Sequence, residues 1–240
     1  MSMYFKAVSH LGLKRKKNED RCFAKKQIDG SLLLVVADGM GGAAGGEKAA
    51  TEAIAVYSDR SERECITPDS LRETLFVAHN MIAKYVKSHK DFEGMGTTLT
   101  AALVRDGMIY WAHVGDSRLY VVKNGSLKQL TTDHRFLDCL IKEGYITLEH
   151  TKQHPLKNVL DQCLGCPEIN PEYGSVRYFQ DSLVLICTDG LYDEVSHDSI
   201  ERILNMKVDI ETKSELLMSA ALISGGRDNV TFVLALADCR

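Results

Sequence analysis

Two stretches of the sequence share one pattern, an uninterrupted apolar run that ends in aspartate and glycine. The runs are LLLVVADG at 32–39 and LVLICTDG at 183–190. A short apolar run without polar alternation is typical of a strand that is buried on both faces. Each run therefore predicts a buried strand that delivers an acidic side chain, Asp38 or Asp189, to the edge of a sheet.

Two further aspartates flank apolar runs in the same way. Asp116 closes MIYWAHVGD at 108–116, and Asp228 of GGRDN directly precedes the run VTFVLALA at 230–237. Burying several carboxylates together costs a large free energy unless cations neutralise them. Clustered carboxylates are hard oxygen ligands that suit Mg²⁺ or Mn²⁺. The four strand-end aspartates therefore predict a metal site.

The bulk composition narrows the class of protein. The 240 residues, 45% apolar and 26% charged, suffice for a sizeable core, and one domain over 1–240 is the simplest division. The net charge is −4, whereas a protein that binds nucleic acid or anionic membranes needs an excess of basic residues on its surface. No signal peptide is recognised, and no apolar run reaches the roughly 18 residues of a membrane-spanning helix. We therefore expect a cytoplasmic protein that binds neither nucleic acid nor membrane, with a monomer as the default state.

The order of the expected elements indicates an α+β fold. We expect strands at 3–10, 20–28, 31–37, in several segments of 97–122, and at 175–179, 183–188 and 230–237. We expect helices at 47–59, 70–89, 197–206 and 211–224. Helices grouped in pairs differ from a strict βαβα alternation. We therefore predict a central sandwich of two antiparallel sheets flanked by pairs of helices, with an insertion over one end at about 134–171.

Local signals mark some of the boundaries. Thr67-Pro68 and the S-x-x-E motif from Ser70 to Glu73 indicate the start of the second helix. Lys123-Asn124-Gly125 predicts a hairpin turn. The seven cysteines are odd in number and scattered, which indicates reduced thiols. Cys163 and Cys166 form a C-x-x-C, but a zinc site needs a second ligand pair at matching spacing, so the role of this pair stays open.

Six short motifs follow one another along nearly the whole chain. They are G-x-x-R-x-x-N-E-D at 12–20, ADGMGG at 37–42, GTT at 96–98, GDSR at 115–118, TDG at 188–190 and GGRDN at 225–229. Each motif alone is common, but in this order they resemble the metal-dependent type 2C Ser/Thr protein phosphatases, in particular the bacterial branch. The resemblance implies two Mn²⁺ or Mg²⁺ ions bridged by an aspartate and a hydroxide. It also implies direct hydrolysis of phosphoserine and phosphothreonine, without a phosphoenzyme.

The resemblance assigns metal ligands to matching positions. Asp38 matches the bridging aspartate, and the carbonyl of Gly39 matches a ligand of the second ion. Asp189 and Asp228 match the remaining ligands of the first ion. Asp116, together with Asp189, matches a third-metal site seen in many bacterial members. The alternative for GDSR is a turn in which Asp116 pairs with the arginine of the same motif.

Four other residues receive roles from the same resemblance. Glu19 matches an acid near the second ion, and Asp20 matches an acceptor for metal-bound water, with Asn229 in a supporting position. Arg15 matches the arginine that grips the phosphate, for which its planar fork is suited. The alternatives are a solvated acid at Glu19 and a surface charge at Arg15. The other basic residues of the KRKK run at 14–17 would line the approach of an anionic substrate.

The chain departs from the family pattern at three places. Bacterial members usually read DGMGGH, but this chain has Ala43 in place of the histidine that is often proposed as a proton donor. His154 of HPLKN is our candidate replacement, and the alternative is a surface-loop histidine without a catalytic part. The DHS triplet of the family is DHR at 133–135, and Gln162 replaces the usual basic residue before Leu-Gly. These last two changes put substrate choice in doubt more than chemistry.

We therefore predict an active metal-dependent phosphatase whose partners are phosphorylated proteins, the products of a Ser/Thr kinase. A rival from another class is a catalytically weak relative that acts as a regulatory binding protein, which the missing histidine favours. A third alternative is a phosphohydrolase for a small molecule. The physiological substrate, the partner kinase and the metal used in the cell do not follow from the sequence.

Overall fold

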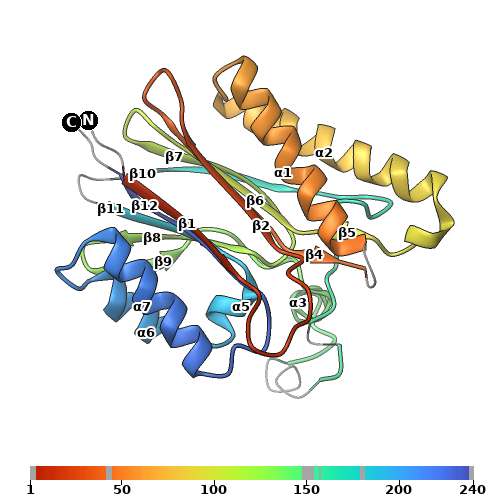
Figure 1. Ribbon diagram of the computed structural model, residues 1–240. Helices are drawn as coiled ribbons and strands as arrows, with labels where there is room; N and C mark the ends of the chain where they lie inside the picture. The colour runs from red at the N-terminus through yellow and green to blue at the C-terminus, as the bar shows by residue number, and fades with distance from the viewer. Residues whose placement is uncertain (1–3, 42–44, 148–153, 157, 179–181, 238–240) are drawn as a thin grey trace.

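The computed structural model describes residues 4–41, 45–147, 154–156, 158–178 and 182–237. Two five-stranded antiparallel sheets form its centre (Figure 1). The strand order in the first sheet is β1 (Tyr4–His10), β12 (Val230–Ala237), β11 (Ser182–Cys187), β8 (Arg118–Lys123) and β9 (Ser126–Gln129). The strand order in the second sheet is β10 (Glu172–Arg177), β7 (Met108–Val114), β6 (Leu99–Arg105), β3 (Leu32–Ala37) and β2 (Arg21–Lys26). A short antiparallel pair, β4 (Gly39–Met40) and β5 (Gly96–Thr97), follows β3.

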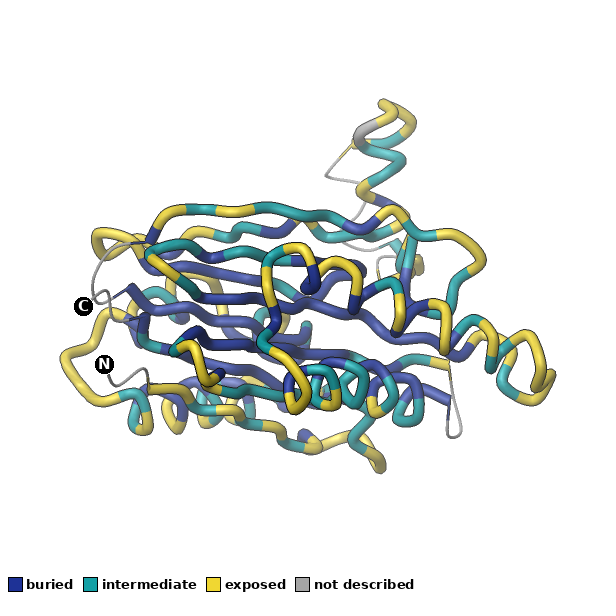
Figure 2. The backbone as a smooth tube through the Cα atoms, turned by 90° about the horizontal axis from the view of Figure 1, so that it is seen from above, coloured by how far each residue is buried: buried dark blue, intermediate teal, exposed yellow. Residues whose placement is uncertain are grey.

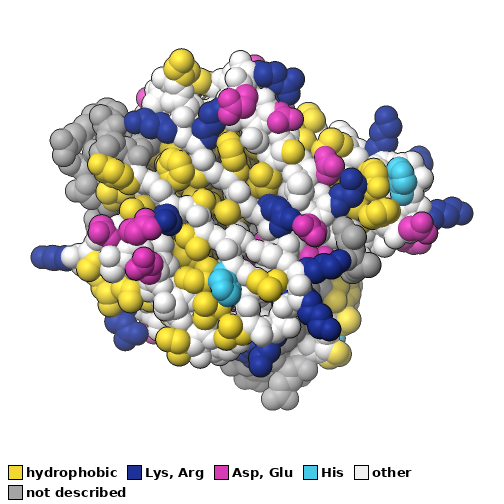
Figure 3. Space-filling model, in the orientation of Figure 1, with side chains coloured by type: hydrophobic (Ala, Val, Ile, Leu, Met, Phe, Trp, Pro, Cys, Tyr) yellow, Lys and Arg dark blue, Asp and Glu magenta, His cyan; other side chains and the backbone are white. Residues whose placement is uncertain are grey.

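Pairs of helices cover the outer faces of the two sheets. The second sheet is covered by α1 (Gly45–Arg63) and α2 (Pro68–Ser88), and the first by α6 (His197–Leu204) and α7 (Ile210–Ile223) (Figure 1). Shorter helices are η1 (Lys90–Phe92), α3 (Phe136–Lys142) and α5 (Asp189–Tyr192). The predicted α+β sandwich with flanking helix pairs is thus confirmed. On the face drawn in Figure 3, both acidic and basic side chains occur, and several basic side chains gather at the lower right.

The apolar strands are continuous because both of their faces are buried. In β3, Leu33 and Val35 pack against α1 and α2, whereas Leu34 and Val36 pack inside the sandwich. Ile186 of β11 meets the latter pair from the opposite sheet. Figure 2 shows the central strands as buried and the helices as partly exposed. Burial on both sides removes the polar alternation that a solvent-facing strand would show.

Some boundaries differ from the sequence prediction. Helix α2 begins at Pro68, and its N-cap is Thr67, whose side-chain oxygen accepts a hydrogen bond from the Ser70 N–H at 3.2 Å. The S-x-x-E motif is therefore not the cap, and Glu73 instead pairs with Arg60 at 3.1 Å. The hairpin turn between β8 and β9 is confirmed, since Asn124 and Gly125 adopt φ values of 52° and 78°. This left-handed conformation is one that asparagine and glycine tolerate best.

The segment 134–171 is called the flap below, and its described parts lie at the end of the sandwich where β4 and β5 meet (Figure 1). Its first part forms α3, and isolated bridges join Arg135 to Leu160 and Thr97 of β5 to Leu164. Cys163 and Cys166 form a turn within it, and both are free thiols. None of the helices in the described ranges is long and apolar enough to cross a membrane.

Candidate metal centre

Three strands bring predicted ligands to one end of the sandwich. Asp38 directly follows β3, Asp189 comes after β11, and Asp228 comes before β12. Because β11 and β12 are neighbours in one sheet, with Cys187 opposite Phe232, the last two acids lie close together. Strand β3 contacts β11 across the sandwich. Three of the four strand-end aspartates thus lie at one site.

Asp20 lies behind Asp38 and is 2% exposed. Its carboxylate accepts a hydrogen bond from Thr188 Oγ1 at 2.8 Å. Burial raises the pKa of Asp20 to about 6. Burial and the charge of Asp20 likewise raise the pKa of Asp38 well above its usual range. Acids in this state need a proton or a nearby cation.

The backbone around Asp38 is fixed on both sides. The Asp38 N–H donates to Thr98 Oγ1 at 3.0 Å, and its carbonyl accepts from the Thr98 N–H at 2.9 Å. A Cβ at Gly39 would lie 2.2 Å from the carbonyl oxygen of Gly46. Only glycine therefore lets β4 approach the start of α1 so closely. Asp38 of the ADGMGG motif and Thr98 of the GTT motif thus lie side by side.

Asn229 fastens the loop that carries the basic run. Its Nδ2 donates to the carbonyls of Leu11 at 2.8 Å and Lys17 at 2.9 Å, and its Oδ1 accepts from the Glu19 N–H at 2.9 Å. The Asn229 side chain is buried, so these bonds are shielded from water. The predicted supporting role of Asn229 has a specific form, since it holds both ends of the loop around Arg15.

Arginines contact two of the predicted ligands. Arg15 Nη2 donates to Asp228 Oδ2 at 2.6 Å, which places the predicted phosphate-binding residue beside the acids. Arg135 Nε donates to Asp116 Oδ2 at 3.0 Å. The proposed turn pairing of Asp116 with Arg118 does not occur.

Arg118 is instead bound by Asp133 at 2.6 Å. Burial raises the pKa of Asp116, and the charge of Arg135 is the largest effect that opposes this increase.

Asp38 and Asp189 fit a metal centre better than Asp116 does. In the described residues no three His, Cys, Asp or Glu side chains are already placed as a metal-binding group. Burial and the charges of Asp116 and Asp228 nevertheless raise the pKa of Asp189 well above its usual range. Asp38 and Asp189 are therefore crowded anions, and within the described residues neither forms an ion pair with a basic side chain. Such a donor set suits a divalent cation. Asp116 differs, because a buried arginine already neutralises it.

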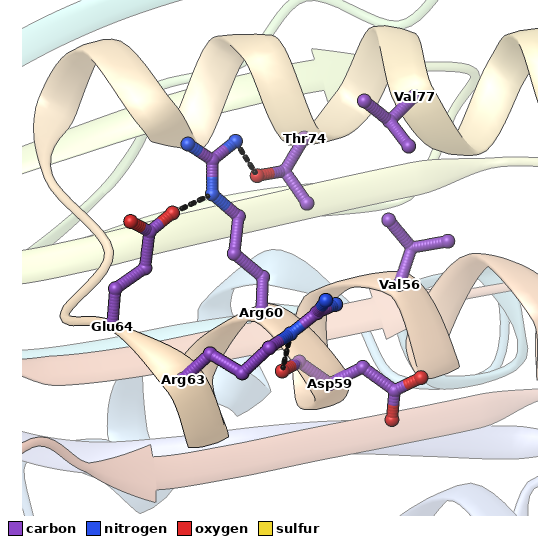
Figure 4. A pocket seen from close by; sticks show the side chains of 7 residues that line it. All are labelled: Val56, Asp59, Arg60, Arg63, Glu64, Thr74 and Val77. Carbon is purple, nitrogen blue, oxygen red and sulfur yellow. Dashed lines mark hydrogen bonds and ion pairs between the residues drawn. The ribbon is translucent and has the colours of Figure 1, made fainter.

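A pocket of about 420 Å³ opens beside Asp189 and Asp228. Its other lining residues are Asn158, Gly190, Asp193, Glu194 and Arg227. Asp193 is not among the residues predicted from the sequence, although it lies four residues after Asp189, a spacing that places two side chains on one helical face. A larger pocket of about 470 Å³ lies between α1 and α2 (Figure 4) and contains none of the predicted ligands.

The two histidine predictions have different outcomes. Residue 43, where the family histidine is missing, lies outside the described residues. The His154 Nδ1 accepts a hydrogen bond from the Leu156 N–H at 3.1 Å, and no contact of His154 with a predicted ligand is found in the described part of the chain. Asn158 of the same segment lines the pocket beside Asp189. A catalytic part for His154 therefore stays a prediction.

Comparison with known proteins assigns the chain to a family. A family profile for protein phosphatase 2C matches residues 10–223. The serine/threonine phosphatase Stp of Listeria monocytogenes is 34% identical over 231 residues, covering 93% of this chain and 92% of that protein. The structure of the S. agalactiae serine/threonine phosphatase has a TM-score of 0.90 at 28% identity and covers 99% of this chain and 100% of that one.

The catalytic domain of PstP, a phosphatase of Mycobacterium tuberculosis, has been solved in complex with two manganese ions. It has a TM-score of 0.86 at 34% identity, covering 98% of this chain and 99% of that one. The fold, the acidic site and these relatives define a serine/threonine phosphatase. The chain belongs to the protein phosphatase 2C family.

Proposed function

We propose that this protein hydrolyses phosphoserine and phosphothreonine in phosphoproteins with the help of two Mn²⁺ or Mg²⁺ ions. The observation that carries the proposal is the crowding of Asp20, Asp38 and Asp189. Burial raises the pKa of all three carboxyls, and the charge of Asp20 adds to the increase at Asp38 and Asp189. Divalent cations relieve such crowding because they supply the missing positive charge. The family membership and the manganese ions bound by PstP support the same conclusion.

The ligands we propose are the carboxylates of Asp38, Asp189 and Asp228 and the carbonyl of Gly39, with Glu19 near the second ion. When bound, two such ions lower the pKa of a water molecule and neutralise charge in an in-line displacement at phosphorus. The chain itself orients the ligands.

Asp20, held by Thr188, places its charge close to the Asp38 carboxyl. Thr98 fixes the backbone that presents the Gly39 carbonyl.

Arg15 binds the phosphate in this proposal. Its guanidinium now contacts Asp228, and the side chain of Arg15 is exposed. With the Asp228 carboxylate holding a cation, the Arg15 guanidinium would be free to bind two phosphate oxygens through its planar fork. Arg15 thus exchanges an acid of the protein for an anion of the substrate, and Asn229 keeps the loop in place during the exchange.

The finer features of the proposal concern partners and location. Substrates of a Ser/Thr kinase are the phosphoproteins we expect, and a monomer acting in the cytoplasm is the expected form. The cysteines of the described ranges support a reducing compartment, since they are free thiols. A regulatory binding protein is the second candidate, because this chain has Ala43 at the position where bacterial relatives usually have a histidine.

The deciding experiment follows hydrolysis of p-nitrophenyl phosphate and of a phosphothreonine peptide with Mn²⁺, with EDTA, and for Asp38→Asn. EDTA is expected to abolish both activities, and added Mn²⁺ to restore them. Asp38→Asn is expected to lower kcat at least about 10³-fold, because it removes one of the carboxylate charges that would hold the ions. The matched control is Asp106→Asn, since Asp106 lies in a turn with φ of 51°, where asparagine is tolerated.

Each outcome has a definite meaning. Activity that survives chelation or Asp38→Asn would contradict the metal mechanism. A well-folded protein without activity under Mn²⁺ or Mg²⁺ would favour the binding protein. Activity on the small ester without the peptide would favour a small-molecule phosphohydrolase.

A further inference from the structure

We propose that Arg135 takes the place of a third metal ion at Asp116, so that the centre of this protein holds two ions. The inference rests on the proposed function, because it concerns the number of cations at the same site. It assigns Arg135 as a positioning residue that ties the flap to the acidic end of the sandwich.

Arg135 closes a ring of hydrogen bonds around Asp116. Its Nε donates to Asp116 Oδ2 at 3.0 Å, and its Nη2 donates to the Tyr192 hydroxyl oxygen at 2.9 Å. The Tyr192 hydroxyl in turn donates to the Asp116 backbone carbonyl at 2.8 Å. Two separate nitrogens of the guanidinium thus bind Asp116 and Tyr192. A cation that bound Asp116 Oδ2 would have to break this ring.

The pair is removed from solvent. The Arg135 side chain is 17% exposed and the Asp116 side chain is 7% exposed. A buried carboxylate needs a compensating positive charge, and the guanidinium supplies one that is never deprotonated in proteins. A divalent ion at the same carboxylate would stand within a few ångströms of a fixed charge of its own sign. The ion would therefore bind only weakly at Asp116.

A second arginine–aspartate pair holds Arg135 in place. Arg118 is bound by Asp133 at 2.6 Å, and its guanidinium stacks on the Tyr192 ring at 3.6 Å from the centroid. Asp133 also lies 3.8 Å from Arg135 Nε. These two arginines and two aspartates balance one another in charge. The charge of Asp116 is therefore already neutralised inside the cluster.

The sequence change that creates this arrangement is specific. The family triplet DHS is DHR at 133–135 in this chain, so an arginine stands where relatives of that pattern have serine. A serine is too short and uncharged to neutralise Asp116. Arg135 also precedes α3 and bridges Leu160, so the same residue links the flap to the site. The departure from the family pattern thus has a structural consequence at the predicted third-metal ligand.

The test counts bound Mn²⁺ by isothermal titration calorimetry and by the electron paramagnetic resonance signal of free Mn²⁺. The native protein and Arg135→Lys are expected to bind about two ions per chain, because both keep the charge at Asp116. Arg135→Ser is expected to bind about one ion more, and the double variant Arg135→Ser/Asp116→Asn to lose it again. The double variant is the matched control, since it lacks Arg135 and also the Asp116 carboxylate that the loss of Arg135 would free.

The outcomes separate this inference from the proposed function. About three ions in the native protein, or no additional ion in a folded Arg135→Ser variant, would overturn the inference and leave the two-ion phosphatase intact. No Mn²⁺ binding by the native protein would instead overturn the proposed function. If Arg135→Ser does not fold, Asp116→Asn in the native background decides. Unchanged stoichiometry supports the inference, and a loss of one ion refutes it.

Discussion

Arg15 and Arg135 make the same kind of contact in opposite surroundings. Each places a guanidinium nitrogen within 3.0 Å of an aspartate at the acidic end of the sandwich. The side chains of Arg15 and Asp228 are 51% and 34% exposed, whereas those of Arg135 and Asp116 are 17% and 7% exposed. An exposed pair exchanges with water and anions, and a buried pair cannot do so without a large desolvation cost.

Their neighbours sharpen the difference. For Arg15, the hydrogen bond to Asp228 is the contact that most raises its pKa, and the remaining acids act only through their charge. Arg135 is additionally bound by the Tyr192 hydroxyl and lies beside Asp133. We infer that the molecule uses one arginine as an exchangeable ligand for substrate and the other as a permanent counter-ion.

The largest expected effect is on stability. Arg135→Ala should lower the free energy of unfolding by about 3 kcal/mol, since it leaves Asp116 buried without a partner. For a chain of this size the loss corresponds to a fall in Tm of roughly 6–12 °C. Arg15→Ala should cost less than about 1 kcal/mol, because its pair is exposed. Urea unfolding of the metal-free variants measures both, and equal losses would remove the distinction between the two pairs.

The next effect is on catalysis and affects Arg15. Arg15→Ala should lower kcat/KM for a phosphothreonine peptide about 10²-fold, because two charge-assisted hydrogen bonds to the phosphate are lost. Arg15→Lys should recover only part of the activity, since an ammonium cannot bind two oxygens in one plane. The control is Lys16→Ala in the same loop, expected to change kcat/KM less than about threefold. If the two alanine variants proved equally impaired, general charge rather than the fork of Arg15 would be responsible.

The difference between the two arginines also marks what the sequence could predict. The ends of β3 and β11 follow from long apolar runs, and these ends bring Asp38 and Asp189 together. Arg15 was found through its place in a motif. The partner of Asp116 could not be found in this way, because it depends on how the flap folds back over the strand ends.

Short elements were missed for a related reason. Strand β4 and helix α5 are two and four residues long, which is less than the window in which hydrophobic periodicity can be recognised. Asp193 lies immediately after α5, so its closeness to the pocket was missed together with the helix. Of the two start signals predicted for α2, the structure uses Thr67-Pro68, because Thr67 and Ser70 form a capping box around the first turn.

The smallest expected effect is that of salt. Raising NaCl from 0.05 to 0.5 M shortens the Debye length to about 4 Å, which screens exposed charges far more than buried ones. The native kcat/KM for the phosphopeptide should fall roughly threefold, and that of Arg15→Ala should fall less, because part of the screened attraction is already absent. The difference in Tm between the native protein and Arg135→Ala should stay constant over the same range. A Tm difference that shrinks with salt would mean that water reaches the Arg135–Asp116 pair, and that this arginine is exchangeable as well.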